Sequence, residues 1–146
     1  MTPEQLQMIR LTFIQMMGRK MEAGRLFYDR LFSIAPDTRP MFRGDMDVQA
    51  RKLMDTLALA IGSFRDMSSL TPILETMAVR HVGYGVRDEH YERVGEALLW
   101  TLGQILGPAF TPHVRAAWTT LYNTIADVMR EAANGVPASS IAAGGR

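Results

Sequence analysis

The sequence contains no cysteine among its 146 residues. This absence excludes disulfide bonds, thiolate metal sites and cysteine nucleophiles. A chain without cysteine is typical of a reducing compartment, so we predict a cytoplasmic location.

Long apolar runs and an excess of one charge are also missing. No stretch reaches the roughly 18 uninterrupted apolar residues of a membrane-spanning helix, and the first residues lack the basic start and cleavage site of a secretory signal. Sixteen basic and fifteen acidic residues leave a net charge of +1 at pH 7. Such a balance creates no field that would attract nucleic acid or an anionic membrane. We therefore expect a soluble protein whose partners are neither nucleic acid nor membrane.

Alternating β-branched patterns and internal repeats do not occur, and apolar residues instead recur at helical spacing along most of the chain. The length fits one domain. We predict an all-α fold with six substantial helices and one short corner at the proline-rich segment PDTRPMF, residues 36–42. The domain should occupy residues 1–134. Residues 135–146 are small and lack a period, which predicts a flexible tail.

Three Thr-Pro pairs, at Thr2, Thr71 and Thr111, each precede an apolar helical pattern. Threonine can cap the free N–H groups of a first turn, and proline is suited to the first helical position. The pairs therefore predict three helix starts, the first strengthened by Gln5 in a capping box with Thr2. The segment DMSS, residues 66–69, is then expected to be a loop ahead of the second pair.

A histidine occupies a place where an apolar residue is expected. Leu74, Met77 and Ala78 fall at i, i+3 and i+4 on one helical stripe, and His81 follows at i+7. A buried imidazole needs a partner for each ring nitrogen. Two interpretations are open: a core histidine bonded to a backbone carbonyl, and a ligand to a metal or cofactor.

The composition restricts which cofactor His81 could hold. A zinc site needs about four protein ligands, and neither cysteines nor clustered carboxylates accompany this histidine. Haem brings four nitrogens of its own and needs a single axial imidazole from the protein. One inward histidine on an apolar helix is therefore chemically sufficient for haem.

Further polar residues lie in otherwise apolar stripes. Gln49 and Leu53 stand one turn apart on the helix expected over about 46–64. Lys52 lies beside them, and its side chain is long enough to reach an anion at the mouth of an apolar slot that holds a cofactor. Tyr28 lies on the helix expected over 22–35. Each residue also has a purely structural interpretation. Tyr28 could be a buried tyrosine bonded to a carbonyl, and Gln49 could lie at the edge of an apolar stripe. His90 lies at a stripe edge near a helix start.

Five segments in order, FYDRLF, PMF, QARKLM, RHVGYGVRDEHYERVGEALL and AAWTTLY, resemble the globins, specifically the single-domain bacterial haemoglobins and the haem domain of flavohaemoglobins. The resemblance extends over residues 5–133. It implies a globin fold, a three-over-three helical sandwich around a pocket for haem b, with His81 as the proximal ligand of the iron.

The same resemblance implies roles around the haem. Phe42 is expected to pack on the porphyrin, and Tyr28 and Gln49 to donate hydrogen bonds to a bound ligand, without being assigned as certain catalytic residues. Leu53 would limit the ligand's space and Lys52 would contact a propionate.

On the proximal side, Tyr91 approaches the histidine in the family, whereas Phe27 and Trp118 match positions for packing or support. One departure concerns the last helix. The glutamate that flavohaemoglobins place beside the proximal histidine aligns with Ala133 here, and Glu131 is roughly 200° away around the helix. The resemblance therefore implies a weaker electron donation from the proximal side.

Three functions follow as expectations. The first is reversible binding of O2, CO or NO on five-coordinate iron, as in oxygen transport. The alternative is a nitric oxide dioxygenase that works with a separate flavin or NADH-dependent reductase, because the sequence has no dinucleotide motif. The third is a regulatory globin-fold module without haem. Such modules typically lose the proximal histidine and the corner phenylalanine, whereas His81 and Phe42 are both present here.

The sequence leaves the oligomeric state open.

Overall fold

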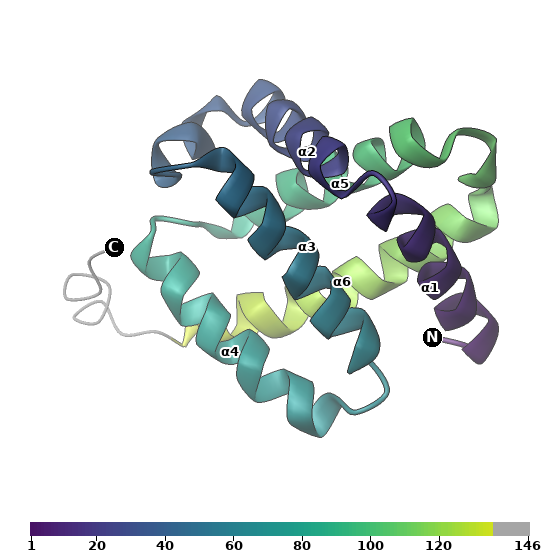
Figure 1. The fold of residues 1–146 in the computed structure, drawn as a ribbon. Helices are drawn as coiled ribbons and strands as arrows, with labels where there is room; N and C mark the ends of the chain where they lie inside the picture. The colour runs from purple at the N-terminus through teal and green to yellow at the C-terminus, as the bar shows by residue number, and fades with distance from the viewer. Residues whose placement is uncertain (136–146) are drawn as a thin grey trace.

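The computed structural model describes residues 1–135, and every regular element in that range is helical (Figure 1). The elements are α1 Pro3–Met17, α2 Lys20–Ile34, the 3-10 helix η1 Pro36–Met41, α3 Met46–Gly62, α4 Met67–Gly83, α5 Asp88–Leu106, the 3-10 helix η2 Gly107–Ala109 and α6 Pro112–Asn134. The prediction of an all-α fold with six substantial helices and a short corner is confirmed. Apart from Gly135, the predicted tail at 135–146 lies outside the described residues.

The helices form two crossed layers, α1, α3 and α4 against α2, α5 and α6 (Figure 1). Across the layers α3 packs on α2, and both α1 and α4 pack on α6, while α5 lies between α2 and α6 within its own layer. This is the three-over-three arrangement predicted from the sequence. None of the helices within residues 1–135 is long and apolar enough to cross a membrane.

Two of the three predicted helix starts are confirmed by their caps. The Thr2 hydroxyl accepts a hydrogen bond from the Gln5 amide at 3.1 Å, and the Gln5 side chain accepts one from the Thr2 amide at 2.9 Å. The Thr111 hydroxyl accepts from the Val114 amide at 3.2 Å. Each cap satisfies N–H groups that a first turn leaves without partners.

The third Thr-Pro prediction is wrong. Helix α4 begins at Met67, so residues 67–69 of the segment expected to be a loop are helical, and Pro72 lies inside the helix. The hydroxyls of Ser68 and Ser69 bond to the Asp66 carboxylate, each at 2.7 Å. The helix starts early because Leu70 and Leu74 belong to one buried stripe, and their burial offsets the single hydrogen bond that Pro72 removes.

The core divides into two clusters. The larger joins α1, α2, α3, α5 and the first half of α6 around Trp118, whose indole N–H donates to the Thr12 hydroxyl at 2.9 Å. The smaller lies under α4 and contains Leu70, Leu74, Ala78, Tyr91, Ala126 and Met129. Helices α3 and α4 are thus held by different cores, although a short loop connects them.

Helices α2 and α3 approach each other closely where Gly24 meets Ala50. A Cβ atom on Gly24 would lie 2.4 Å from the Ala50 Cβ, well inside van der Waals contact. Only glycine allows this crossing distance. The crossing holds Tyr28, one turn after Gly24, against Gln49, the neighbour of Ala50.

We predict that Gly24→Ala lowers the free energy of unfolding by about 1–3 kcal/mol, because the added methyl forces the two backbones apart. Urea denaturation followed by circular dichroism measures the change.

Gly62→Ala is the matched control, since a Cβ atom there meets nothing within 4 Å. It should leave stability unchanged or raise it by up to about 1 kcal/mol. Equal stabilities of the Gly24→Ala variant and the wild type would show that the crossing does not depend on glycine.

Candidate functional site

His81 lies in the last turn of α4, and the helix itself supplies a partner for one ring nitrogen. Its Nδ1 is 2.6 Å from the carbonyl oxygen of Met77, four residues earlier. Since a carbonyl only accepts, Nδ1 carries the proton in this pair. The other nitrogen, Nε2, has no hydrogen-bond partner within residues 1–135. It therefore offers a lone pair, which is the form in which histidine binds metals.

Burial keeps this imidazole neutral. The ring is half-buried beside the smaller core cluster. Loss of solvation lowers the pKa of His81, and the bond to the Met77 carbonyl opposes that shift only in part. The hydrogen bond to a backbone carbonyl is therefore observed, and it leaves the second ring nitrogen available for a ligand role.

Tyr28 lies in a group of aromatic rings formed by α2 and the corner after it. The ring centroids of Phe27, Phe32 and Phe42 lie 5.0, 5.9 and 5.1 Å from that of Tyr28. Burial raises the pKa of Tyr28 to about 12, so the phenol stays protonated at physiological pH. Its hydroxyl donates to the backbone carbonyl of Gln49 over 3.4 Å. A bond of this length is weak and leaves the hydroxyl able to donate to a stronger acceptor.

Three residues of α3 were expected at the site. Gln49 and Leu53 are both half-buried and stand one turn apart, and Leu53 packs on the larger core. The Gln49 side chain makes no hydrogen bond within the described chain, so Gln49 reaches Tyr28 through its backbone instead of its amide. Lys52 is exposed and forms no ion pair with any described residue.

Phe42 follows η1 and lies edge-on to Tyr28 and to Phe32, the latter at 5.5 Å. The structure thus brings Tyr28, Phe42, Gln49 and Leu53 together on the α2 and α3 side. His81 belongs to the α4 side. Helices α3 and α4 are not closely packed on one another over residues 1–135.

Tyr91, in the first turn of α5, has a buried hydroxyl with no hydrogen-bond partner, the one such side-chain atom in the described residues. Ala133 packs on the cluster that contains Tyr91, whereas Glu131 is exposed. At the place where the resemblance expects a glutamate, α6 therefore has the apolar side chain of Ala133. A buried hydroxyl without a partner costs roughly 1–3 kcal/mol.

These observations test whether the site fits a haem. His81 provides one free axial nitrogen, and Tyr91 provides a buried hydroxyl that awaits a partner. Half-buried apolar side chains lie on both clusters that flank the candidate site. They are Met46, Phe42 and Leu53 on the larger cluster, and Met77 and Val86 on the smaller. One imidazole and apolar walls are what a porphyrin requires of a protein. The residues fit the group.

The two residues expected to serve packing do so. Phe27 is buried against Tyr28, and Trp118 is wholly buried in the larger core.

His90 is a residue whose importance the sequence did not reveal. It is 3% exposed, and both ring nitrogens have partners. With Asp37 and Glu89 it forms a group with the spacing of metal ligands. The Arg87 guanidinium, however, lies 3.4 Å from the Asp37 carboxylate and 2.7 Å from that of Glu89. The group is therefore an ion-pair network.

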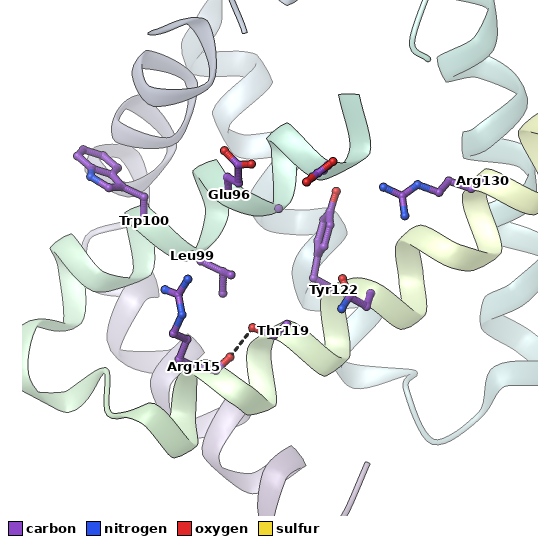
Figure 2. Close-up of a pocket in the computed structure, with 10 residues that line it drawn as sticks. Glu96, Leu99, Trp100, Arg115, Thr119, Tyr122 and Arg130 are labelled. Atoms are coloured by element: carbon purple, nitrogen blue, oxygen red, sulfur yellow. Dashed lines mark hydrogen bonds between the residues drawn. The ribbon is translucent and has the colours of Figure 1, made fainter. Parts of the chain in front are cut away.

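A cavity of about 510 Å³ lies elsewhere, between α5 and α6 (Figure 2). Figure 2 shows Tyr122 rising from α6 toward α5 between Arg115 and Arg130. Three of the charged groups that line it have partners: Glu96 pairs with Arg93, and the Arg115 and Arg130 guanidinium groups lie over the rings of Phe110 and Tyr91. None of the predicted site residues lines this cavity.

An all-α sandwich with a histidine on α4 whose Nε2 has no partner in residues 1–135, and with a buried phenol on α2, is compatible with a helical protein that holds a flat metal cofactor. Comparison with known proteins specifies the class further. The Globin family model matches residues 25–129. The chain belongs to the globin family.

Several proteins similar to this chain are bacterial. Flavohemoproteins of Bordetella parapertussis and Bordetella bronchiseptica are 35% identical over 109 residues, which is 72% of this chain and 27% of each relative. The chain thus spans about a quarter of the length of these curated relatives. A bacterial globin from Campylobacter jejuni superposes with a TM-score of 0.80 at 25% identity and covers 91% of this chain and 96% of its own.

An engineered carbene transferase, made from a Rhodothermus marinus protein proposed to be a nitric oxide dioxygenase, shares the fold. Its TM-score is 0.81 at 24% identity, and the match covers 92% of this chain and 94% of that one.

Proposed function

We propose that this globin is a haem b protein that binds diatomic gases reversibly, with His81 as the axial ligand. Membership of the globin family and the flavohemoprotein relatives imply a haem cofactor. His81 would hold the haem, whose iron would supply the binding of O2, CO or NO. The observation that carries the proposal is the free Nε2 of His81, held by the bond from Nδ1 to Met77.

The Met77 carbonyl fixes both the tautomer and the orientation of the His81 ring. A carbonyl withdraws less proton density from Nδ1 than a carboxylate does, so the imidazole stays a neutral ligand of moderate strength. Because Ala133 packs at this place and Glu131 is exposed, α6 supplies no glutamate beside Tyr91 that could strengthen it. This chemistry favours reversible binding over cleavage of the O–O bond.

On the other side, Tyr28 is the hydrogen-bond donor. Tyr28 would donate to a gas ligand that carries partial negative charge, and a hydrogen bond to a charged group contributes roughly 1.5–3 kcal/mol. That corresponds to about ten- to a hundredfold slower release. The Gln49 amide, which has no other partner in residues 1–135, is a second donor. Leu53 and Phe42 keep water out, and the exposed Lys52 pairs with a propionate.

The first prediction concerns His81. Replacement by glycine removes the axial nitrogen, so His81→Gly should lose the absorption spectrum of histidine-ligated haem, and added imidazole should restore it. The exposed His113, changed to Gln, is the control and should match the wild type. An unchanged spectrum for His81→Gly would remove this residue from the iron.

The second prediction concerns Tyr28. Tyr28→Phe should release O2 about ten- to a hundredfold faster, because the donor to the charged ligand is lost. CO carries little charge when bound, so its release should change by no more than about twofold. Stopped-flow displacement measures both rates. Equal O2 release from variant and wild type would contradict the donor role.

The phenol also determines a pH dependence. Because its pKa is raised to about 12, Tyr28 remains a donor well above the range in which free tyrosine ionises. The O2 release rate of the wild type should therefore stay constant from about pH 7 to pH 10 and rise only above that.

A second candidate function is the conversion of NO to nitrate, favoured by the 35% identity to flavohemoproteins. The reaction joins NO, O2 and one electron to give nitrate, and a reductase must supply the electron. Tyr28 and Gln49 would then hold the O2 while NO enters over Leu53.

We expect the O2 complex mixed with NO to yield about one equivalent of nitrate, and more only with NADH and an added flavin reductase. Tyr28→Phe should slow nitrate formation in the single turnover. Absence of nitrate in the first mixing would leave gas binding as the function.

A further inference from the structure

A second histidine, His90, is buried in the first turn of α5, and its hydrogen bonds define its tautomer. Nδ1 accepts from the Arg87 backbone amide at 2.8 Å, and Nε2 lies 2.7 Å from an oxygen of the Asp37 carboxylate. Since Nδ1 accepts, Nε2 carries the proton and donates it to Asp37. A neutral imidazole therefore satisfies both of its nitrogens. The same hydrogen bond lowers the pKa of Asp37, which stays ionised.

The two bonds of His90 connect segments that border the site on opposite sides. Arg87 ends the loop that follows His81, and Asp37 lies in η1, five residues before Phe42. The link joins positions 53 residues apart. Within residues 1–135, helix η1 packs mainly on α2 and has no more than slight contact with α5. His90 therefore links the loop that follows His81 to the corner that contains Phe42.

We propose that His90 is a positioning residue that fixes the separation between Phe42 and His81, and with it the width of the slot for haem. This inference rests on the proposed function, because it assigns the slot to haem. The ion pairs of Arg87 with Asp37 and Glu89 are exposed and contribute little. The buried imidazole carries the link.

Two variants of His90 each keep one of its two hydrogen bonds and remove the other. The Asn oxygen in His90→Asn replaces Nδ1 and keeps the Arg87 bond, whereas the Gln nitrogen in His90→Gln replaces Nε2 and keeps the Asp37 bond. Each variant breaks the link at one end. Asp37→Ala removes the acceptor altogether, and Asp37→Asn retains a carbonyl oxygen that accepts from His90 and should rescue the link.

The first measurement is the rate at which the ferric protein loses haem to an excess of apomyoglobin. We expect His90→Asn, His90→Gln and Asp37→Ala to lose haem about tenfold faster than the wild type, and Asp37→Asn to remain within about twofold. Thr12→Val is the matched control, because it removes the buried Trp118 bond between α1 and α6, away from the slot. It should lower the melting temperature without changing haem loss.

The second measurement needs no haem. Amide hydrogen exchange of the apoprotein should be faster at residues 36–42 and 84–90 in His90→Asn than in the wild type. Failure of the wild type to bind haem would overturn the proposed function, and the exchange rates would still show whether the link exists.

Unchanged haem loss in His90→Asn and Asp37→Ala overturns the positioning role, even if exchange becomes faster. Equal acceleration in Thr12→Val overturns it as well, since haem loss would then follow general stability.

Discussion

The hydrogen bond from His81 Nδ1 to the Met77 carbonyl is the interaction on which the site depends. Both atoms belong to one helix, so the geometry of α4 sets the tautomer and no other element has to supply a partner. The bond makes a buried imidazole tolerable and directs its second nitrogen outward from the helix as a free base. In the proposed haem site the opposite side would need only apolar walls and a donor, the roles that we assign to Phe42, Leu53 and Tyr28.

The fold serves this arrangement by carrying the two sides on separate cores. Helix α3 is held against α2 by the close approach at Gly24, which places Tyr28 beside the backbone of Gln49. Helix α4 rests on α6 through the smaller cluster, in which the Tyr91 hydroxyl stays without a partner. Because different clusters hold α3 and α4, the two sides of the proposed site are not closely packed on each other in residues 1–135.

Local patterns predicted most of the fold and part of the site. The caps at Thr2 and Thr111 and the inward place of His81 follow from residues within a turn of one another. The start of α4 did not, because tertiary burial of Leu70 overrides the Thr-Pro signal one turn later. The role of His90 was hidden for a similar reason, since Asp37 lies far away in the sequence. The backbone contact of Gln49 with Tyr28 depends on the crossing distance of two helices, which no local pattern encodes.

The most direct measurement is the absorption spectrum of the purified protein after addition of haem, in the oxidised, reduced and CO-bound states. If His81 binds the iron, an intense absorption band should appear at about 400 nm. The band should shift on reduction and again with CO, as expected for one histidine ligand and an open sixth position. A spectrum equal to that of free haem in all three states would contradict the assignment of His81.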